Sequence, residues 1–186
     1  MFFGSLNDQV WVPVRQWKLS DVAVADDARA RVLTTVGSLT RMLEREFDMP
    51  LKVEVEEQFI DHSDAMESML LACANGTMSL RRKVALLYKK QVMFEAESVL
   101  PLQDIHMDLM ADLERGEIPL GSLLMDRGMS LSRTDLSITQ IVGEPPFRGR
   151  WARQSILKSH LGTTALVVEV FHALLWQKLA QKGAVR

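Results

Sequence analysis

Residues 80–101 read LRRKVALLYKKQVMFEAESVLP, and this stretch decides the fold. It contains two mainly apolar runs, Leu80–Tyr88 and Val92–Leu100, separated by the polar pair Lys89-Lys90. Two such runs around a short polar segment are typical of antiparallel strands joined by a tight turn. Pro101 closes the second run, since proline lacks the N–H group of a continuing strand. The stretch therefore predicts a β-hairpin.

The length of the turn determines which hairpin residues share a face. If the turn has two residues, Tyr88 faces Gln91, and counting outward places Arg82 opposite Glu97. Opposed residues of an antiparallel pair point to the same side of the sheet. A bulge would shift this register. The absence of Asn-Gly or Asp-Gly at the turn also leaves a longer loop open.

Outward from the hairpin, alternating apolar residues predict further strands, and apolar residues at helical spacing predict helices. The further strands are expected at 51–56, 134–142, 155–158 and 164–171, the last two turning near 160–162. The helices are expected at 26–47 with a break at Gly37-Ser38, at 102–113 ending at Gly116, within 118–125 and at 173–181. Residues 61–75 combine helical spacing with a turn signal and stay ambiguous. Helices placed between hairpins predict an α+β fold with an antiparallel sheet.

The composition bounds the domain organisation. The chain has 186 residues, 47% of them hydrophobic and 25% charged, which is the size and balance of one globular domain. It shows no internal repeat and no Pro/Gly/Ser-rich linker. We therefore expect a single domain over residues 1–186, with an N-terminal arm at 1–20 and a C-terminal helical tail at 173–186. A domain of this size can enclose a ligand pocket.

Charge and cysteine content indicate a cytoplasmic protein without a nucleic-acid partner. The formal net charge is -2, and the basic residues are spread along the chain. No stretch has the 18 or more apolar residues of a membrane span, and the start does not resemble a signal peptide. Cys73 is the only cysteine, so no internal disulfide forms. Its apolar neighbours predict an inert buried thiol.

No sequence motif predicts a metal or a cofactor. The four histidines are far apart, and none stands at ligand spacing from another: His62, His106, His160 and His172. The chain has no Gly-x-Ser-x-Gly elbow and no glycine loop that cradles phosphate. Sequence alone leaves a dispersed Ser-His-Asp arrangement open.

Glu169 is the most informative charged residue, because it interrupts the apolar segment ALVVEVF at residues 165–171. Alternation places Glu169 on one face of the strand together with Val167 and Phe171. A carboxylate in such surroundings is costly without a partner. We interpret Glu169 as a pocket residue, the alternative being a solvent-facing or salt-bridged glutamate.

Three segments, in this order, resemble the chorismate lyase family. They are the hairpin LRRKVALL…SVLP at 80–101, the segment IPLG at 118–121, and WARQ at 151–154 leading to VEVF at 168–171. The first aligns on the family's hairpin without a gap. Weaker similarity, which includes Leu131-Ser-Arg, extends the resemblance over about residues 35–172.

The resemblance implies an antiparallel sheet of about six strands with helical flaps over a buried ligand, and neither metal nor cofactor. Carried over by position, Arg82 and Glu169 would be the catalytic pair, with Arg82 on a ligand carboxylate and Glu169 on the ligand's polar edge. Leu39, Leu120 and Gly121 would complete the substrate pocket. The implied reaction eliminates pyruvate from chorismate to give 4-hydroxybenzoate, a precursor for quinone (ubiquinone) or other aromatic biosynthesis.

The residue types suit that chemistry. An arginine fork binds a carboxylate bidentately, and a buried glutamate with a raised pKa would hold or relay a proton. Without the resemblance, Arg82 would be interpreted as a surface residue. A dry pocket that fixes one conformer also predicts slow release of the aromatic product.

One position departs from the family pattern. Where the family commonly has an arginine late in the second hairpin strand, this chain has Glu97. In the register given above, Glu97 would compete with a ligand carboxylate for Arg82. Arg153 would then supply the missing charge as a substrate-binding residue, with plain packing as the alternative.

Two functions follow from this sequence. The first is a cofactor-free lyase acting on chorismate. The second is a module that binds a small aromatic or cyclohexadienyl carboxylate without turnover, resembling the effector-binding domains of some bacterial transcription regulators. Sequence leaves the exact ligand and the oligomeric state open.

Overall fold

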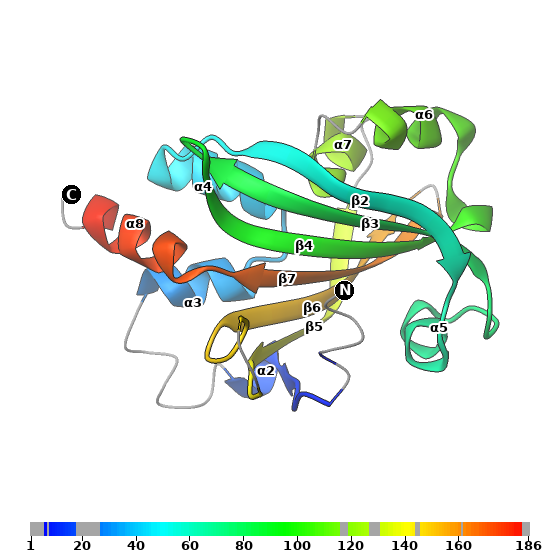
Figure 1. Cartoon of the computed structure of the whole chain (residues 1–186), viewed down its shortest axis with the longest axis horizontal. Helices are drawn as coiled ribbons and strands as arrows, with labels where there is room; N and C mark the ends of the chain where they lie inside the picture. Colours follow the sequence, from blue (N-terminus) through cyan, green and yellow to red (C-terminus); the bar gives the residue numbers. More distant parts are fainter. Residues whose placement is uncertain are drawn as a thin grey trace.

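The computed structural model describes residues 6, 8–17, 27–115, 119–126, 131–143, 146–160 and 162–183. Its centre is one antiparallel sheet with the strand order β1-β5-β6-β7-β4-β3-β2 (Figure 1). The strands are β1 Val12–Pro13, β2 Lys52–His62, β3 Met78–Tyr88, β4 Gln91–Pro101, β5 Leu131–Gln140, β6 Trp151–Ser159 and β7 Thr164–Phe171. Six of the seven match the expected sheet, and β1 adds a two-residue pairing at the β5 edge.

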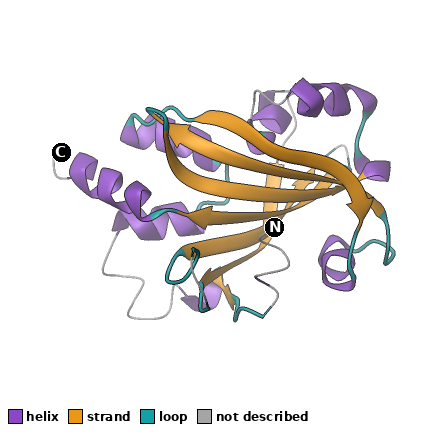
Figure 2. Cartoon of the chain, viewed as in Figure 1, coloured by secondary structure: helices purple, strands orange, loops and turns teal. Residues whose placement is uncertain are grey.

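Helices connect and cover the strands (Figure 2). They are α2 Val14–Trp17, α3 Asp27–Thr34, α4 Leu39–Phe47, α5 Ala65–Leu71, the 3-10 turn η2 Leu102–Asp104, α6 Met107–Arg115, α7 Leu120–Asp126 and α8 Ala173–Gly183. The break at Gly37-Ser38 is confirmed, since the Ser38 hydroxyl accepts from the Arg41 N–H and caps α4. Within the described residues, no helix is long and apolar enough to cross a membrane.

Several boundaries differ from expectation. The ambiguous segment 61–75 divides into the end of β2 and helix α5, whose start carries a capping box formed by Asp64 and Glu67. The helix expected at 102–113 is interrupted after η2, and its expected end at Gly116 lies outside the described residues. Strand β6 already begins at Trp151. The N-terminal arm contains β1 and α2, while residues 1–5, 7 and 18–20 lie outside the described part.

The predicted pairing of Arg82 with Glu97 is wrong, and a bulge is the reason. Lys89 and Lys90 do form a two-residue turn, both with positive φ, and Tyr88 pairs with Gln91 as expected. The register then shifts between Leu86 and Leu87, where β4 carries one extra residue. Arg82 consequently pairs with Ser98, and Glu97 pairs with Lys83.

A one-residue shift moves a side chain to the other face of a sheet. Glu97 therefore lies on the face opposite to Arg82, beside Lys83, whose pKa is raised partly by the nearby Glu97 charge. The largest cause of that raised pKa is the hydrogen bond that the Lys83 ammonium donates to the Glu56 carboxylate. Glu97 therefore does not compete with a ligand carboxylate for the Arg82 guanidinium.

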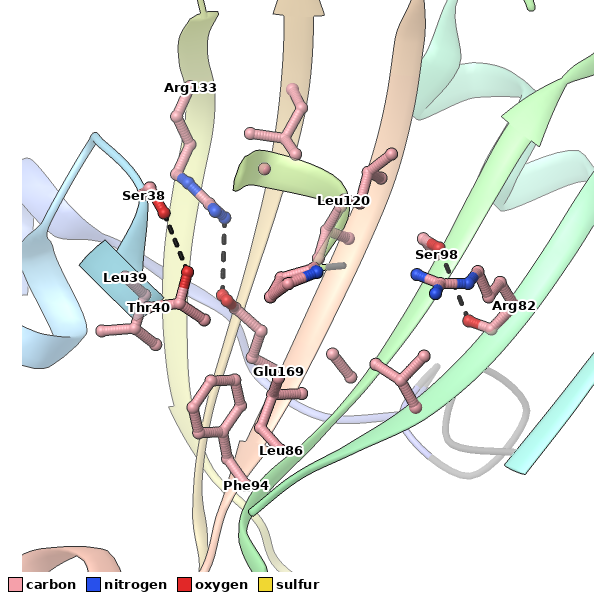
Figure 3. Close-up of a pocket in the computed structure, with 16 residues that line it drawn as sticks. Ser38, Leu39, Thr40, Arg82, Leu86, Phe94, Ser98, Leu120, Arg133 and Glu169 are labelled. Atoms are coloured by element: carbon pink, nitrogen blue, oxygen red, sulfur yellow. Dashed lines mark hydrogen bonds and ion pairs between the residues drawn. The ribbon is translucent and has the colours of Figure 1, made fainter. Parts of the chain in front are cut away.

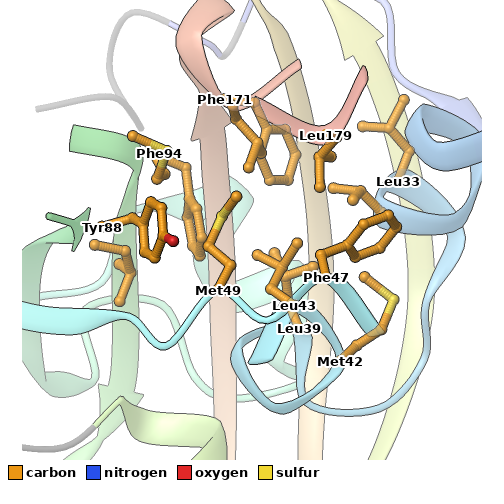
Figure 4. Packing of buried hydrophobic residues seen from close by; sticks show 14 of the residues in the cluster. Leu33, Leu39, Met42, Leu43, Phe47, Met49, Tyr88, Phe94, Phe171 and Leu179 are labelled. Carbon is orange, nitrogen blue, oxygen red and sulfur yellow. The ribbon is translucent and has the colours of Figure 1, made fainter. Parts of the chain in front are cut away.

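The two faces of the sheet bury different clusters. On one face, helices α3, α4 and α8 pack over Val84, Leu86, Phe94 and Phe171 (Figure 4). Helices α6 and α7 cover the other end of the same face, around Leu100, Leu157 and Val167. The opposite face packs Val99, Val168 and Val170 against Leu6 and Leu71. Cys73 packs at the edge of this cluster and is half-buried, so the expected burial of its thiol is only partial.

Candidate active site

A cavity lies on the sheet face covered by α4 and α7, between the two clusters of that face (Figure 3). Its floor comes from strands β3, β4, β5, β6 and β7, and its roof from the starts of α4 and α7. The lining residues are Ser38, Leu39, Thr40, Arg82, Val84, Leu86, Phe94, Ala96, Ser98, Pro119, Leu120, Gly121, Arg133, Leu157, Val167 and Glu169. The predicted residues Leu39, Arg82, Leu120, Gly121 and Glu169 all meet here.

The cavity has a volume of about 60 Å³. An engineered cavity that holds benzene measures roughly 150 Å³. The cavity as described is therefore smaller than one that holds an aromatic ring.

Arg82 stands within β3 and is only 3% exposed. Its pKa is lowered from the ordinary 12.5 to about 10, because burial disfavours the charged form. The guanidinium remains a cation at neutral pH. A buried cation on a largely apolar wall is the type of group that a ligand carboxylate stabilises.

Glu169 projects from β7 into the same cavity and is held by arginines. Directly across the ladder, Arg153 of β6 donates its Nε–H to one carboxylate oxygen and its Nη2–H to the other at 3.0 Å. Arg133 of β5 approaches with its Nη1 at 3.4 Å from Oε2. Glu169 therefore both lines the cavity and forms salt bridges, although the sequence analysis treated these as alternatives.

Glu169 is a carboxylate at neutral pH. Burial alone would raise its pKa, but the charges of Arg153 and Arg133 and the hydrogen bond from Arg153 outweigh burial and lower it. The expectation of a raised pKa is therefore wrong, because it did not include the arginine partners of this carboxylate. The ionised group accepts hydrogen bonds and is poorly suited to storing a proton.

Arg153 lies behind the cavity and does not line it. Its side chain is 0% exposed, and besides Glu169 it donates through Nη1 to the Val32 carbonyl at 2.9 Å and to the Thr35 carbonyl at 3.2 Å. The contacts fix the orientation of Glu169 and tie it to the end of α3. The structure thus places Arg153 as a positioning residue for Glu169.

Arg133 is the charged cavity residue that our sequence analysis missed. It lies in β5, LSRTDLSITQ, where polar residues are frequent and a single arginine does not stand out. The available signal was its place in the Leu131-Ser-Arg segment of the resemblance. Its side chain is 4% exposed, and its pKa is lowered to about 10, mainly by burial.

The roof consists of two helix starts linked by hydroxyl groups. Leu39 begins α4, and Leu120 and Gly121 begin α7. Thr40 Oγ1 lies 3.0 Å from Ser122 Oγ, and Ser38 Oγ lies 3.0 Å from Thr40 Oγ1 and 3.4 Å from Ser122 Oγ. These hydroxyl contacts connect α4 to α7 across the top of the cavity.

The cavity is suited to an anionic ligand with an apolar ring. Two arginine side chains and one carboxylate line it, a third arginine lies behind the carboxylate, and most other lining groups are apolar. A mainly apolar cleft with a few converging polar groups is the usual form of a small-molecule site. Among the described residues, no three His, Cys, Asp or Glu side chains are grouped to hold a metal ion.

Solved structures with this fold include ligand-binding domains of transcription regulators. The ligand-binding domain of a GntR-family transcriptional regulator from Bordetella bronchiseptica superposes with a TM-score of 0.56 and 14% identity, covering 66% of this chain and 86% of that one. The effector domain of PhnF from Mycobacterium smegmatis gives 0.58 and 11%, covering 74% and 89%. At such identities the likeness concerns the fold alone.

Sequence comparison identifies the family. A search of curated proteins finds no match. The family model described as chorismate lyase matches residues 6–181, which is nearly the whole chain and includes every cavity residue. The chain therefore belongs to the chorismate lyase family.

Proposed function

We propose that this protein is a chorismate pyruvate-lyase that forms 4-hydroxybenzoate and pyruvate in the cavity between the sheet and helices α4 and α7. The observation that carries the proposal is the convergence of Arg82 and ionised Glu169 in one largely apolar cavity of a chain from this family. Arg82 binds the ring carboxylate as a charged pair. Glu169 accepts a hydrogen bond from the ring hydroxyl at the other end of the ligand.

The reaction breaks the C–O bond between the ring and the enolpyruvyl ether. The hydrogen on the hydroxyl-bearing ring carbon is lost, the ring becomes aromatic, and the proton reaches the methylene carbon of the leaving group to form the methyl group of pyruvate. Positive charge that develops on the ring carbon lies next to the hydroxyl held by Glu169. A fixed carboxylate stabilises such a charge without the reorganisation that water requires.

Glu169 therefore acts as an electrostatic and orienting group. Its low pKa makes it a weak base, so transfer of the ring hydrogen to the leaving group within the substrate is the route that suits this site. Aromatisation makes the elimination strongly downhill, so fixing one conformer in a dry cavity supplies much of the catalysis. The closed roof also favours slow release of 4-hydroxybenzoate.

The alternative is a module that binds an aromatic carboxylate without turnover. The observation in its favour is the shared fold with the ligand-binding and effector domains of transcription regulators. The cavity charges suit either function, because both need an anchored carboxylate.

Turnover distinguishes the two functions. The purified protein is incubated with chorismate, and 4-hydroxybenzoate and pyruvate are measured together, with Glu169→Gln as the variant. Equal amounts of both products above the spontaneous rate, strongly reduced in the variant, support the lyase. A folded protein that binds 4-hydroxybenzoate but gives only the spontaneous rate supports the binding module.

A further inference from the structure

Arg133 faces the ligand cavity from the side opposite to Arg82. Arg133 comes from β5 and Arg82 from β3, and the strand order places β6, β7 and β4 between them. The sheet curves so that both guanidinium groups approach the same space, with Glu169 of β7 nearer to Arg133 (Figure 3). The cavity thus has one cation at each end.

The charge of Arg133 is only partly compensated. Both oxygens of Glu169 accept hydrogen bonds from Arg153, while Arg133 reaches only one of them, at 3.4 Å. The other hydrogen bond of the Arg133 head goes to the neutral hydroxyl of Ser155. Among the described residues, the buried Nε of Arg133 has no hydrogen-bond partner. One carboxylate therefore stands between two guanidinium groups.

We propose that Arg133 binds a second carboxylate, that of the enolpyruvyl ether, while Arg82 binds the ring carboxylate. This inference rests on the proposed function and names the residue that holds the second carboxylate of its substrate. A buried cation beside a carboxylate that is already engaged gains a partner when such a ligand binds.

The connectivity of the substrate agrees with this placement. The ring hydroxyl lies across the ring from the ring carboxylate, and the ether is attached to the carbon next to the hydroxyl. With the ring carboxylate on Arg82 and the hydroxyl on Glu169, the ether substituent extends beside Glu169. Arg133 is the arginine that lines the cavity there.

Arg133 then distinguishes substrate from product. The product 4-hydroxybenzoate keeps the groups that bind Arg82 and Glu169, but has lost the carboxylate that binds Arg133. Removing the Arg133 charge should therefore weaken a dianionic ligand and spare the product. Removing the Arg82 charge should weaken both.

The test uses binding, so that it does not depend on turnover. Calorimetry compares 4-hydroxybenzoate with the unreactive dianion 3-(carboxymethoxy)-4-hydroxybenzoate, in the wild type, in Arg133→Met and in Arg133→Lys. We expect the wild type to bind the dianion at least about tenfold more tightly, as a charged hydrogen bond implies. Arg133→Met should lose this preference while its affinity for 4-hydroxybenzoate changes less than about threefold, and Arg133→Lys should restore part of the preference.

Two results overturn the inference. One is a wild type without preference for the dianion, and the other is an Arg133→Met variant that weakens both ligands equally, which indicates a structural role. A wild type that prefers the dianion but does not turn over chorismate contradicts the proposed function and supports the Arg133 site. Turnover without the preference contradicts the inference alone, and a wild type that binds neither ligand contradicts both.

Discussion

Replacing Arg82 by methionine should separate ligand binding from folding stability. Methionine keeps much of the side-chain length and removes the charge. A pKa lowered from 12.5 to about 10 means that the folded protein holds this cation less favourably than water does, by about 3 kcal/mol at about 1.4 kcal/mol per pKa unit. Because the folded-state pKa lies below the unfolded one, this cost is fully present at every pH below about 10.

The ligand carboxylate is expected to recover part of that cost. Loss of a hydrogen-bonded charge costs about 1.5–3 kcal/mol of binding free energy, so Arg82→Met should weaken 4-hydroxybenzoate by roughly 10- to 150-fold. The free energy of unfolding of the ligand-free variant should change little, because burial already disfavours this cation in the folded protein. Calorimetry and urea denaturation measure the two quantities.

The neighbouring Arg81 supplies the matched control. Its side chain points to the other face and binds both carboxylate oxygens of buried Glu67, at 2.6 Å and 2.5 Å. Arg81→Met should leave 4-hydroxybenzoate affinity unchanged and lower the free energy of unfolding by about 3 kcal/mol, since it strands a buried carboxylate. Unchanged affinity in Arg82→Met, or weaker binding accompanied by reduced stability, would refute the reasoning.

Three further changes test separate parts of the site. Because the pKa of Glu169 is lowered, its contribution to stability is present above the unfolded value of about 4.3 and is lost as the pH falls through the lower folded value. Glu169 therefore stays ionised between about pH 5.5 and pH 8, and 4-hydroxybenzoate affinity should not change over this range. A change of affinity in this range that disappears in Glu169→Gln would contradict this. Glu97→Gln should leave 4-hydroxybenzoate affinity unchanged in calorimetry, because Glu97 lies beside Lys83 on the other face of the sheet. A clear gain in affinity would instead support the register in which Glu97 pairs with Arg82. Ser122→Ala removes the hydroxyl contact between α7 and Thr40. Stopped-flow measurement should then show 4-hydroxybenzoate dissociating several-fold faster, as expected for loss of about 1 kcal/mol. An unchanged dissociation rate would show that this contact does not slow product release.

The fold was predictable because its signals are local. The hairpin at 80–101 and the one that ends at Phe171 contain mainly apolar runs separated by short polar turns. The α4 start is marked by Ser38, a good N-cap residue after a glycine. Such patterns arise from burial of the strands in the core and from satisfaction of helix-end N–H groups, both of which leave signals in short stretches of sequence.

The register of the first hairpin was not predictable. The extra residue in β4 falls near Met93, and methionine suits a buried position on either face. No glycine or proline marks the bulge. One unmarked residue therefore decides whether Glu97 or Ser98 shares the face of Arg82.

The Arg153–Glu169 pair, in contrast, could have been found. Counting outward from the turn near residues 160–162 places Arg153 opposite Glu169, as the structure has it. This pairing would have predicted a lowered pKa for Glu169 instead of a raised one. The contact between Arg133 and Glu169 could not be counted from a hairpin register, since β6 lies between β5 and β7 in the sheet.

The most direct test of the account is a crystal structure of the protein after incubation with chorismate. We expect 4-hydroxybenzoate in the cavity, with its carboxylate on Arg82 and its hydroxyl on Glu169, and α4 and α7 closed above it. Intact chorismate in the cavity, or a ligand bound away from Arg82 and Glu169, would contradict the account.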